Sequence, residues 1–397
     1  MNLWSDATAI EQELIDLRRE LHQHPELSFE ERWTSAFIAD YLEKLGLAVR
    51  RNVGRTGVVA VLRGGRPGPT VALRADMDAL PVTEESGVPY ASENPGRMHA
   101  CGHDTHVACL LGAAKLLTGV RAQLGGNVAF LFQPAEEIGA GAEAMLADGA
   151  FDDPRPDMVF GLHNHPEIPI GKVAIKVGPL MAASASIAIN VRGKGGHGAM
   201  PHRDIDPIVA ASAIVMNLQT IVSRSVNPLE PAVVTIGQFH AGTAGNIIPE
   251  TAELTGTIRA FDEGLYNELP RMIERVITNT AAAFGAAAEL KVHQSIPAPV
   301  VNEERATAIV ERAVVKALGE DAVVRPTPSM GGEDFALFQK RVPGCFIWLG
   351  VGNPAIGAVH PWHSPHYLVD ERALKIGAYT LAQAAADAID NLGSGGR

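Results

Sequence analysis

The stretch THVACLLGAAKLLT (105–118) decides the fold class, because it is a helical pattern set between two strand-like runs. Its apolar residues recur at the spacing of one helical face: Val107, Leu110, Leu111, Ala114 and Leu117. Asp104 or Thr105 is the expected N-cap. The flanking runs, 70–73 and 127–132, are short, apolar and typical of buried strands. Strands that alternate with helices predict an α/β layer.

Further runs of both kinds extend this layer along the chain. Strands are expected at 57–62, 158–162 and 345–350, and helices at 10–21, 30–45, 303–318 and 371–391. We therefore predict a catalytic domain of residues 1–183 and 296–397, with a central mixed sheet flanked by helices.

Between these two parts the pattern changes. SASIAINVRG (184–193) alternates like a half-buried strand, and Asp206-Pro207 then opens a helix to about residue 223. Two strands, a helix and a strand follow, at 232–239, 251–261, 263–284 and 286–294. The order βαββαβ is that of a ferredoxin-like α+β unit. Residues 184–295 are thus predicted to form an inserted domain.

Composition narrows the classes of partner and compartment. A net charge of -12 over 397 residues argues against nucleic acid and anionic membrane surfaces, which need clustered positive charge. No apolar run reaches the roughly 18 residues of a membrane span, and the first twenty residues show no secretory signal. The three cysteines, Cys101, Cys109 and Cys345, form no disulfide framework. We expect a cytoplasmic protein with a small-molecule partner.

Potential metal ligands follow three of the predicted strands: Asp76 and Asp78, Glu136 and Glu137, and His163 and His165. Sites in open α/β sheets form beyond the carboxyl ends of strands, so these side chains are expected to converge. MHACGHDTHVA (98–108) and HPWHSPH (360–366) add a thiol and further imidazoles. This set suits two metal ions about 3.5 to 4 Å apart. Because adjacent strand-end residues point in opposite directions, one glutamate can bind metal while the other acts as general base.

Nine motifs in order carry a family resemblance: RRELHQHPELSFEE (18–31), RADMDALP (74–81), MHACGHDTHVA, QPAEE (133–137), GLHNHP (161–166), GKGGHGAMPH (193–202), AGNIIPE (244–250), GGEDF (331–335) and HSPHY (363–367). Together they resemble the aminoacylase and carboxypeptidase family of dinuclear metallopeptidases. More narrowly, they are similar to its amidohydrolase branch, which contains hippurate hydrolases, N-acyl-amino-acid amidohydrolases and auxin-conjugate hydrolases.

The resemblance implies two divalent metal ions, Zn, Mn, Co or Ni, and five ligands for them: Cys101, His103, Glu137, His163 and His363. Cys101 would bridge the ions, and Glu136 would be the catalytic carboxylate. Many relatives instead carry a bridging aspartate and a His-x-Asp motif where this chain has Asp76-x-Asp78. The difference favours the amidohydrolase branch. It also makes Asp76 and Asp78 supports of the ligands.

The resemblance implies that the inserted domain, residues 184–295, is a lid and dimerisation domain. In it, His197 would donate to the tetrahedral oxyanion, in dimeric relatives from the opposite subunit. Asn246 and Arg259 would hold the substrate's carboxylate. An arginine suits this task, because its guanidinium gives two parallel charge-assisted hydrogen bonds to a carboxylate.

Simpler interpretations compete with several of these assignments. His165 competes with His163, and the loop histidines His360 and His366 compete with His363. His99 and His106 are expected beside the ligands or on the surface, and Cys109 and Cys345 in the core. Arg259 could be an ion-pair residue on a strand, and His197 a loop histidine.

The resemblance implies a metal-dependent amidohydrolase that cleaves N-acyl or N-aroyl amino acids of the hippurate type to a carboxylic acid and a free amino acid. One alternative is a dipeptidase or carboxypeptidase with the same site. Another is a non-catalytic metal-dependent binding protein on the same fold. A homodimer formed through the lid domain is expected.

Overall fold

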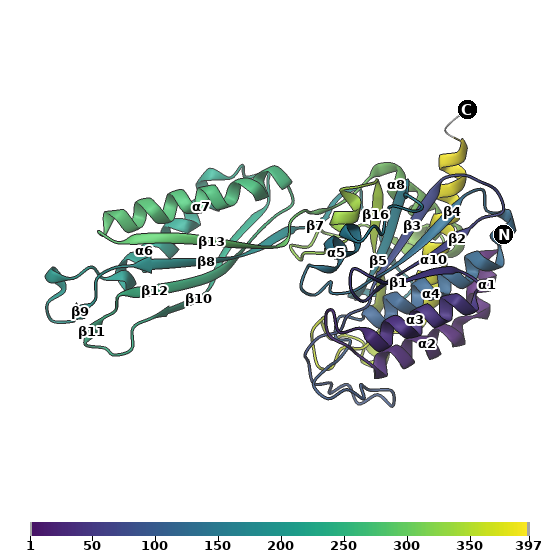
Figure 1. Ribbon diagram of the computed structural model, residues 1–397, viewed down its shortest axis with the longest axis horizontal. Coiled ribbons are helices and arrows are strands. Elements are labelled where there is room, and N and C mark those ends of the chain that lie inside the picture. The colour runs from purple at the N-terminus through teal and green to yellow at the C-terminus, as the bar shows by residue number, and fades with distance from the viewer. Residues whose placement is uncertain (1, 395–397) are drawn as a thin grey trace. The chain divides into compact units, whose positions relative to one another are not determined.

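A computed structural model describes residues 2–394 of the chain. Within them the chain divides into two compact units. The first runs to Leu180 and resumes with Val301–Thr327 and with the chain from Asp334 onward. The second comprises Met181–Val300 and Pro328–Glu333. Figure 1 shows both units, coloured along the chain.

An eight-stranded mixed sheet forms the centre of the first unit, in the order β1-β2-β4-β3-β5-β16-β6-β15. The pairs β3–β4, β3–β5 and β5–β16 are parallel, whereas β1–β2 and β2–β4 are antiparallel. The strands are β1 (Ala48–Val53), β2 (Gly57–Arg63), β3 (Thr70–Asp76), β4 (Asn127–Gln133), β5 (Met158–Pro169), β6 (Val173–Ala174), β15 (Val323–Val324) and β16 (Gly344–Gly352). The predicted mixed α/β architecture is confirmed.

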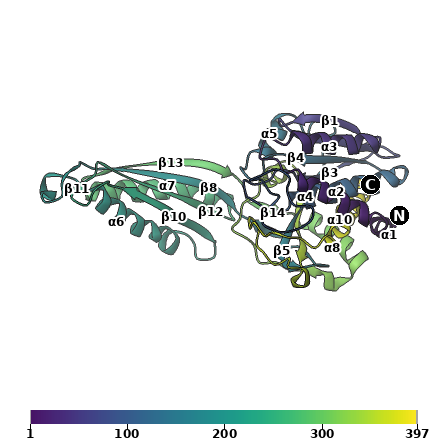
Figure 2. The ribbon, with the colours of Figure 1, turned by 90° about the horizontal axis from the view of Figure 1, so that it is seen from below.

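Helices flank this sheet: α1 (Leu3–Ala9), α2 (Glu11–Gln23), α3 (Arg32–Lys44), α4 (His103–Gly119), α5 (Gly141–Ala147), α8 (Glu304–Leu318), α9 (Ala336–Gln339) and α10 (Ala373–Ser394). Helices α4 and α10 pack on each other and on β3, and α2 packs on α4 (Figure 2). Gly112 allows this close approach, because a Cβ there would lie 2.6 Å from Leu14 and 2.8 Å from Ala378. The buried face of α4 thus lies in the main core.

The start of α4 differs from the sequence-based prediction. Its N-cap is Gly102, with φ at 81° and no side-chain cap, so the prediction of Asp104 or Thr105 was wrong. Asp104 lies inside the first turn and is fully buried, with Oδ2 2.8 Å from Arg18 Nε and 2.7 Å from His22 Nδ1. Ion pairing therefore overrides the capping preference of this aspartate.

The second unit has the order β8 (Ala183–Arg192), α6 (Pro207–Thr220), β10 (Ala232–Ala241), β12 (Thr251–Ala260), α7 (Glu263–Ala283) and β13 (Ala287–Ile296). Its four-stranded sheet runs β10-β12-β8-β13, with all three pairs antiparallel. Asp206 and Asp262 cap α6 and α7 with their side chains. This is the βαββαβ arrangement of a ferredoxin-like unit.

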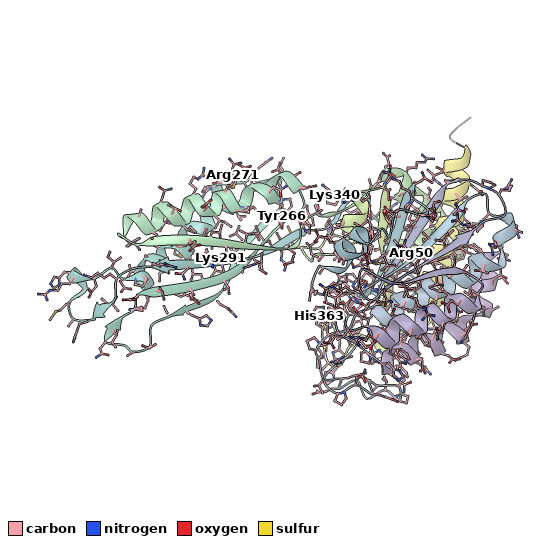
Figure 3. All side chains as sticks on the ribbon, in the orientation of Figure 1. Arg50, Tyr266, Arg271, Lys291, Lys340 and His363 are labelled. Atoms are coloured by element: carbon pink, nitrogen blue, oxygen red, sulfur yellow. The ribbon has the colours of Figure 1, made fainter. Side chains whose placement is uncertain are left out.

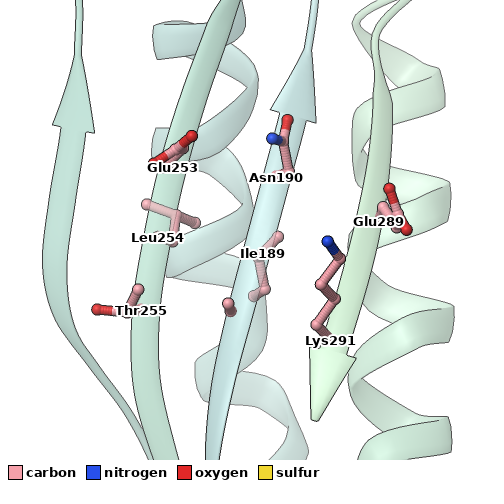
Figure 4. Close-up of a pocket in the computed structure, with 8 residues that line it drawn as sticks. Ile189, Asn190, Glu253, Leu254, Thr255, Glu289 and Lys291 are labelled. Carbon is pink, nitrogen blue, oxygen red and sulfur yellow. The ribbon is translucent and has the colours of Figure 1, made fainter.

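The two faces of this sheet differ in chemistry. Ile189 and Leu254 are buried in the core with α6 and α7. The alternate residues Asn190, Thr255 and Lys291 line a hollow, to which Ile189 and Leu254 also contribute (Figure 4). The period-two alternation of β8 and β12 explains why one face is apolar and the other polar.

Helix α6 and the π-helical turn after it, Pro207–Ser225, form the one stretch within residues 2–394 long and apolar enough to cross a membrane, with a mean hydropathy of 1.3. Only 28% of its most apolar window is buried. One side nevertheless packs into the core of the second unit through Ala210, Ile214 and Leu218. The other side exposes Val209 and Met216, by 50% and 70%.

Candidate metal centre

Strand ends and the start of α4 bring the predicted ligands of the first unit together. Asp76 ends β3, Glu136 and Glu137 follow β4, and His163 lies within β5. Among the described groups whose metal-binding atoms lie within 4.8 Å of one another, two contain predicted ligands: Cys101, His103 and Glu137, and Asp76, His103, His106 and His163. His103 belongs to both groups and links them.

His103 is the first residue of α4 and is fully buried. Its Nδ1 lies 3.3 Å from Asp78 Oδ1, and its Nε2 lies 3.8 Å from Glu137 Oε1. Burial lowers the pKa of His103, but the nearby charges of Asp76, Asp78 and Glu137 outweigh burial and raise it to about 10. Asp78 is thus the carboxylate near Nδ1, and Glu137 and Asp76 lie near Nε2, Asp76 Oδ2 at 3.7 Å.

Cys101 and His163 form the other side of the cluster, with Sγ 3.5 Å from Nε2. His163 Nδ1 donates to the carbonyl of Asn164 at 2.7 Å, which leaves the Nε2 lone pair available to a metal. Burial, together with the charges of Glu137 and Glu136, raises the pKa of the Cys101 thiol well above its ordinary value. A bound cation would reverse this effect, since coordination deprotonates a thiol.

His363 lies on a loop of the first unit (Figure 3), with Nε2 3.6 Å from Glu137 Oε2. Its φ of 66° is unusual for a histidine, and its backbone N–H donates to the Ala100 carbonyl at 2.9 Å. Strained residues of this kind persist where the surroundings fix them, often at functional sites. The loop therefore holds His363 against Glu137.

Asp78 organises the glutamate pair from behind. Its two carboxylate oxygens accept the backbone N–H groups of Glu136 and Glu137, each at 3.1 Å. Ser28 Oγ donates to the same carboxylate at 2.7 Å. With its oxygens engaged by these donors and by His103, Asp78 supports the turn after β4.

His106 is buried, and both of its ring nitrogens are engaged. Nδ1 lies 2.5 Å from Asp76 Oδ1, and Nε2 accepts the backbone N–H of Asn164 at 2.8 Å. A saturated imidazole cannot also bind metal, so His106 is a support of the cluster and lies away from the surface. Asp76 also accepts from Arg74 Nη1 of its own strand at 2.9 Å, and its contact with His106 ties β3 to α4.

The competing histidines lie in other settings. His366 is exposed and contacts the Glu85 carbonyl at 2.8 Å, and the ring of His360 lies 5.4 Å from that of His366. His165 packs against Trp348 and Trp362, with ring centroids 4.8 and 4.6 Å away. Among the alternatives, only His163 and His363 approach the atoms of Cys101 and Glu137.

Sequence reasoning did not single out Asn164, although it lies in the motif GLHNHP. Its side-chain amide donates to the Cys101 carbonyl at 2.7 Å, and its Oδ1 accepts from Trp362 Nε1 at 3.2 Å. A Cβ on Gly102 would lie 2.4 Å from Asn164 Nδ2. The glycine of CGHD therefore provides the room in which Asn164 holds the Cys101 loop. A motif asparagine between two histidines was the available signal.

The other predicted residues belong to the second unit. His197 in β9 (Gly196–His197) pairs with Ile247 of β11 (Ile247–Ile248), and the Asn246 carbonyl accepts from Gly198 N at 2.9 Å. His197 and Asn246 are therefore neighbours, and both are exposed.

Arg259 lies near the far end of β12, where Nη1 donates to the Met330 carbonyl at 2.7 Å. At about 3.3 Å per residue, the strand from Thr251 to Arg259 spans roughly 26 Å. Asn246 precedes the start of that strand (Figure 1). Asn246 and Arg259 of one chain are therefore too far apart to contact the same small carboxylate.

The donor set of the first unit fits metal ions. Within the part of the chain that the structure describes, His103 Nε2 and Glu137 Oε1 are buried without a hydrogen-bond partner. Buried polar atoms are normally paired, and these two face each other. Thiolate, imidazole and carboxylate together are ligands suited to zinc-like divalent ions.

The chain is similar to known proteins over nearly its whole length. The model of peptidase family M20/M25/M40 matches residues 72–387. The N-acetyl-L-cysteine deacetylase of Bacillus subtilis is 44% identical over 97% of this chain and 90% of its own length. Thermostable carboxypeptidase 2 of Saccharolobus solfataricus is 42% identical over 96% of both chains.

A solved structure shares the fold. It is a dinuclear metal-binding peptidase of the M20 family from Bacillus subtilis, with a TM-score of 0.85 and 39% identity over 96% of this chain and 99% of that one. The family match covers well over half of the chain and includes every candidate ligand named above. The chain belongs to peptidase family M20/M25/M40.

Proposed function

We propose that this hydrolase binds two divalent metal ions and cleaves the amide bond of N-acyl or N-aroyl amino acids, with release of a carboxylic acid and a free amino acid. The observation that carries the proposal is the buried cluster of Cys101, His103 and Glu137 beside His163. Relatives named as a deacetylase and as a dinuclear metal-binding peptidase support it.

The residues that would hold the two ions are Cys101, His103, Glu137, His163 and His363. Bound divalent ions lower the pKa of water and polarise a carbonyl. Glu136 directly precedes a ligand in a turn fixed by Asp78, so it is the proposed base that takes a proton from the attacking water. Glu136 then gives that proton to the leaving nitrogen.

Substrate recognition is assigned to the second unit. Arg259 and Asn246 bind the free carboxylate of the amino-acid part, and His197 donates a hydrogen bond to the developing oxyanion. Arg259→Ala should raise KM for N-acetyl amino acids by about tenfold or more. The matching amino-acid amides, which lack the carboxylate, serve as control substrates. An equal KM for wild type and variant on the free acids would remove Arg259 from this role.

We further propose a homodimer formed through the second unit. Asn246 and Arg259 of one chain lie at opposite ends of β12, so both can meet one carboxylate only if they come from two copies. Helix α6 supplies a surface for pairing, because PIVAASAIVMNLQT contains no charged residue and exposes Val209 and Met216. Large exposed apolar patches on soluble domains commonly mark interfaces. The three free cysteines are consistent with action in the cytoplasm.

A substrate panel tests the proposal. The protein is stripped of metal, reconstituted with Mn, Zn, Co or Ni, and assayed on hippurate, N-acetyl amino acids and dipeptides. Faster turnover of N-acyl amino acids supports the proposal. Preference for peptides favours a dipeptidase or carboxypeptidase, the alternative suggested by the carboxypeptidase relative. Metal binding without turnover of any substrate would favour a binding protein.

A further inference from the structure

Glu31 is a buried carboxylate to which the mechanism above gives no task. It is fully buried and accepts two hydrogen bonds, from Thr56 Oγ1 at 2.6 Å and from Ala135 N at 2.9 Å. Ala135 directly precedes Glu136 and Glu137. Glu31 and Asp78 therefore receive three consecutive backbone N–H groups of the glutamate turn, at residues 135, 136 and 137.

The position of Glu31 in its own helix also indicates that its side chain serves the glutamate turn. Glu31 is the N-cap residue of α3, where a side chain usually accepts from the first helical N–H groups, but its side chain makes no such bond. Glu26 does so instead and accepts from Trp33 N at 3.1 Å and Thr34 N at 2.9 Å. Glu31 is thereby left to contact the turn.

Unusual backbone conformations gather around Glu31. Ala135 has φ at 53°, and Phe29 and Arg55 have φ at 63° and 78°. The Arg55 guanidinium lies 4.2 Å from the centre of the Phe29 ring, and Thr56 follows Arg55 directly. Such conformations cost free energy and persist only where neighbouring contacts fix them. The carboxylate of Glu31 joins the strained turn at Thr56 to the strained turn at Ala135.

We propose that Glu31 is a positioning residue for the reaction: it fixes the left-handed conformation of Ala135 and thereby aims the carboxylates of Glu136 and Glu137. Asp78 receives the two later N–H groups, and Glu31 receives the first one, at the entry into the turn. The inference rests on the proposed function for its kinetic part. Its metal-binding part depends only on Glu137 as a ligand.

The test compares Glu31→Ala with Glu26→Ala, which removes a half-buried carboxylate that caps α3 and does not contact the turn. We expect Glu31→Ala to lower kcat on an N-acetyl amino acid by about tenfold to a hundredfold, with KM changed less. Binding of Mn²⁺ or Zn²⁺, measured by titration calorimetry, should weaken as well. Glu31→Gln keeps an oxygen acceptor for Ala135 N and should recover most of both losses.

Two results would overturn the proposal. One is a Glu31→Ala protein with the metal affinity and kcat of wild type. The other is an equal loss in Glu31→Ala and Glu26→Ala at equal loss of thermal stability, because this would mark a structural role alone. If wild type hydrolyses no N-acyl amino acid, the proposed function fails, and metal affinity of the same variants still decides the role of Glu31. If Glu31→Ala does not fold, Glu31→Gln is compared with Thr56→Val. The second variant removes the Thr56 hydrogen bond and leaves the Ala135 contact of Glu31 in place.

Discussion

At the scale of the residue, two adjacent glutamates carry different proposed tasks. Glu137 faces His103 and His363, whereas Glu136 is the proposed base. We predict that Glu136→Gln lowers kcat by about a hundredfold or more, because the amide cannot take a proton from water. Metal content, measured by mass spectrometry of the purified variant, should equal that of wild type. Turnover at the wild-type rate would contradict the assignment. Glu136→Asp is the control that keeps the negative charge but shortens the side chain.

Glu31 also gives a pH dependence of stability. Burial raises the pKa of Glu31 to about 7 from an ordinary value of 4.5. A carboxyl whose pKa is raised in the folded state favours folding while it is protonated, and this contribution is lost as pH rises from about 4.5 through 7. We predict that wild type loses about 1 to 3 kcal/mol of unfolding free energy relative to Glu31→Gln between pH 5 and pH 8.

The measurement is urea unfolding of both proteins, without metal, at the two pH values. The difference between the proteins isolates Glu31, since other titrating groups are shared. Parallel pH curves would show that Glu31 titrates alike in the folded and unfolded chains.

At the scale of the element, the start of α4 requires a residue without a side chain at position 102. Gly102 has φ at 81°, and a Cβ there would meet Asn164 Nδ2 at 2.4 Å. We predict that Gly102→Ala lowers the free energy of unfolding by about 1 to 3 kcal/mol, from backbone strain and the displaced Asn164. Gly119→Ala, at the other end of α4, is the control, because nothing lies within 4 Å of its Cβ position. Equal urea midpoints for the two variants would refute the argument.

The same helix shows what could be predicted from the sequence. Periodicity predicted α4 at 105–118, and the helix is observed at His103–Gly119, because an apolar face must be buried wherever it lies. The N-cap was predicted wrongly, since Asp104 is recruited by Arg18 and His22 from α2. That pairing depends on tertiary packing, which local preference does not contain. For the same reason Asn164 and Glu31, which act through backbone groups far along the chain, carry little signal of their own.

At the scale of the whole molecule, the candidate residues are divided between two units. The proposed metal ligands lie in the first, whereas His197, Asn246 and Arg259 lie in the second. The second unit also includes Pro328–Glu333, which strand and helix patterns could not assign to it. Within that unit, β12 separates Arg259 from Asn246, and this separation is the reason for our proposal that a complete site draws on two chains.

Mixing two inactive variants tests this argument. Glu136→Gln lacks the proposed base, and His197→Ala lacks the proposed oxyanion donor. If His197 acts on the metal centre of the partner chain, a mixed dimer contains one site with both groups intact. Random mixing makes half of all dimers mixed, with one intact site in two, so we predict about a quarter of the wild-type activity.

The measurement is the rate on an N-acetyl amino acid after the two variants are unfolded together and refolded, with each variant refolded alone as the control. A mixture as inactive as its components would show that His197 serves its own chain or does not act in the reaction. As a control for pairing, Met216→Glu is added to both variants. A charge on the exposed face of α6 should abolish both the dimer, seen by light scattering, and the recovered activity.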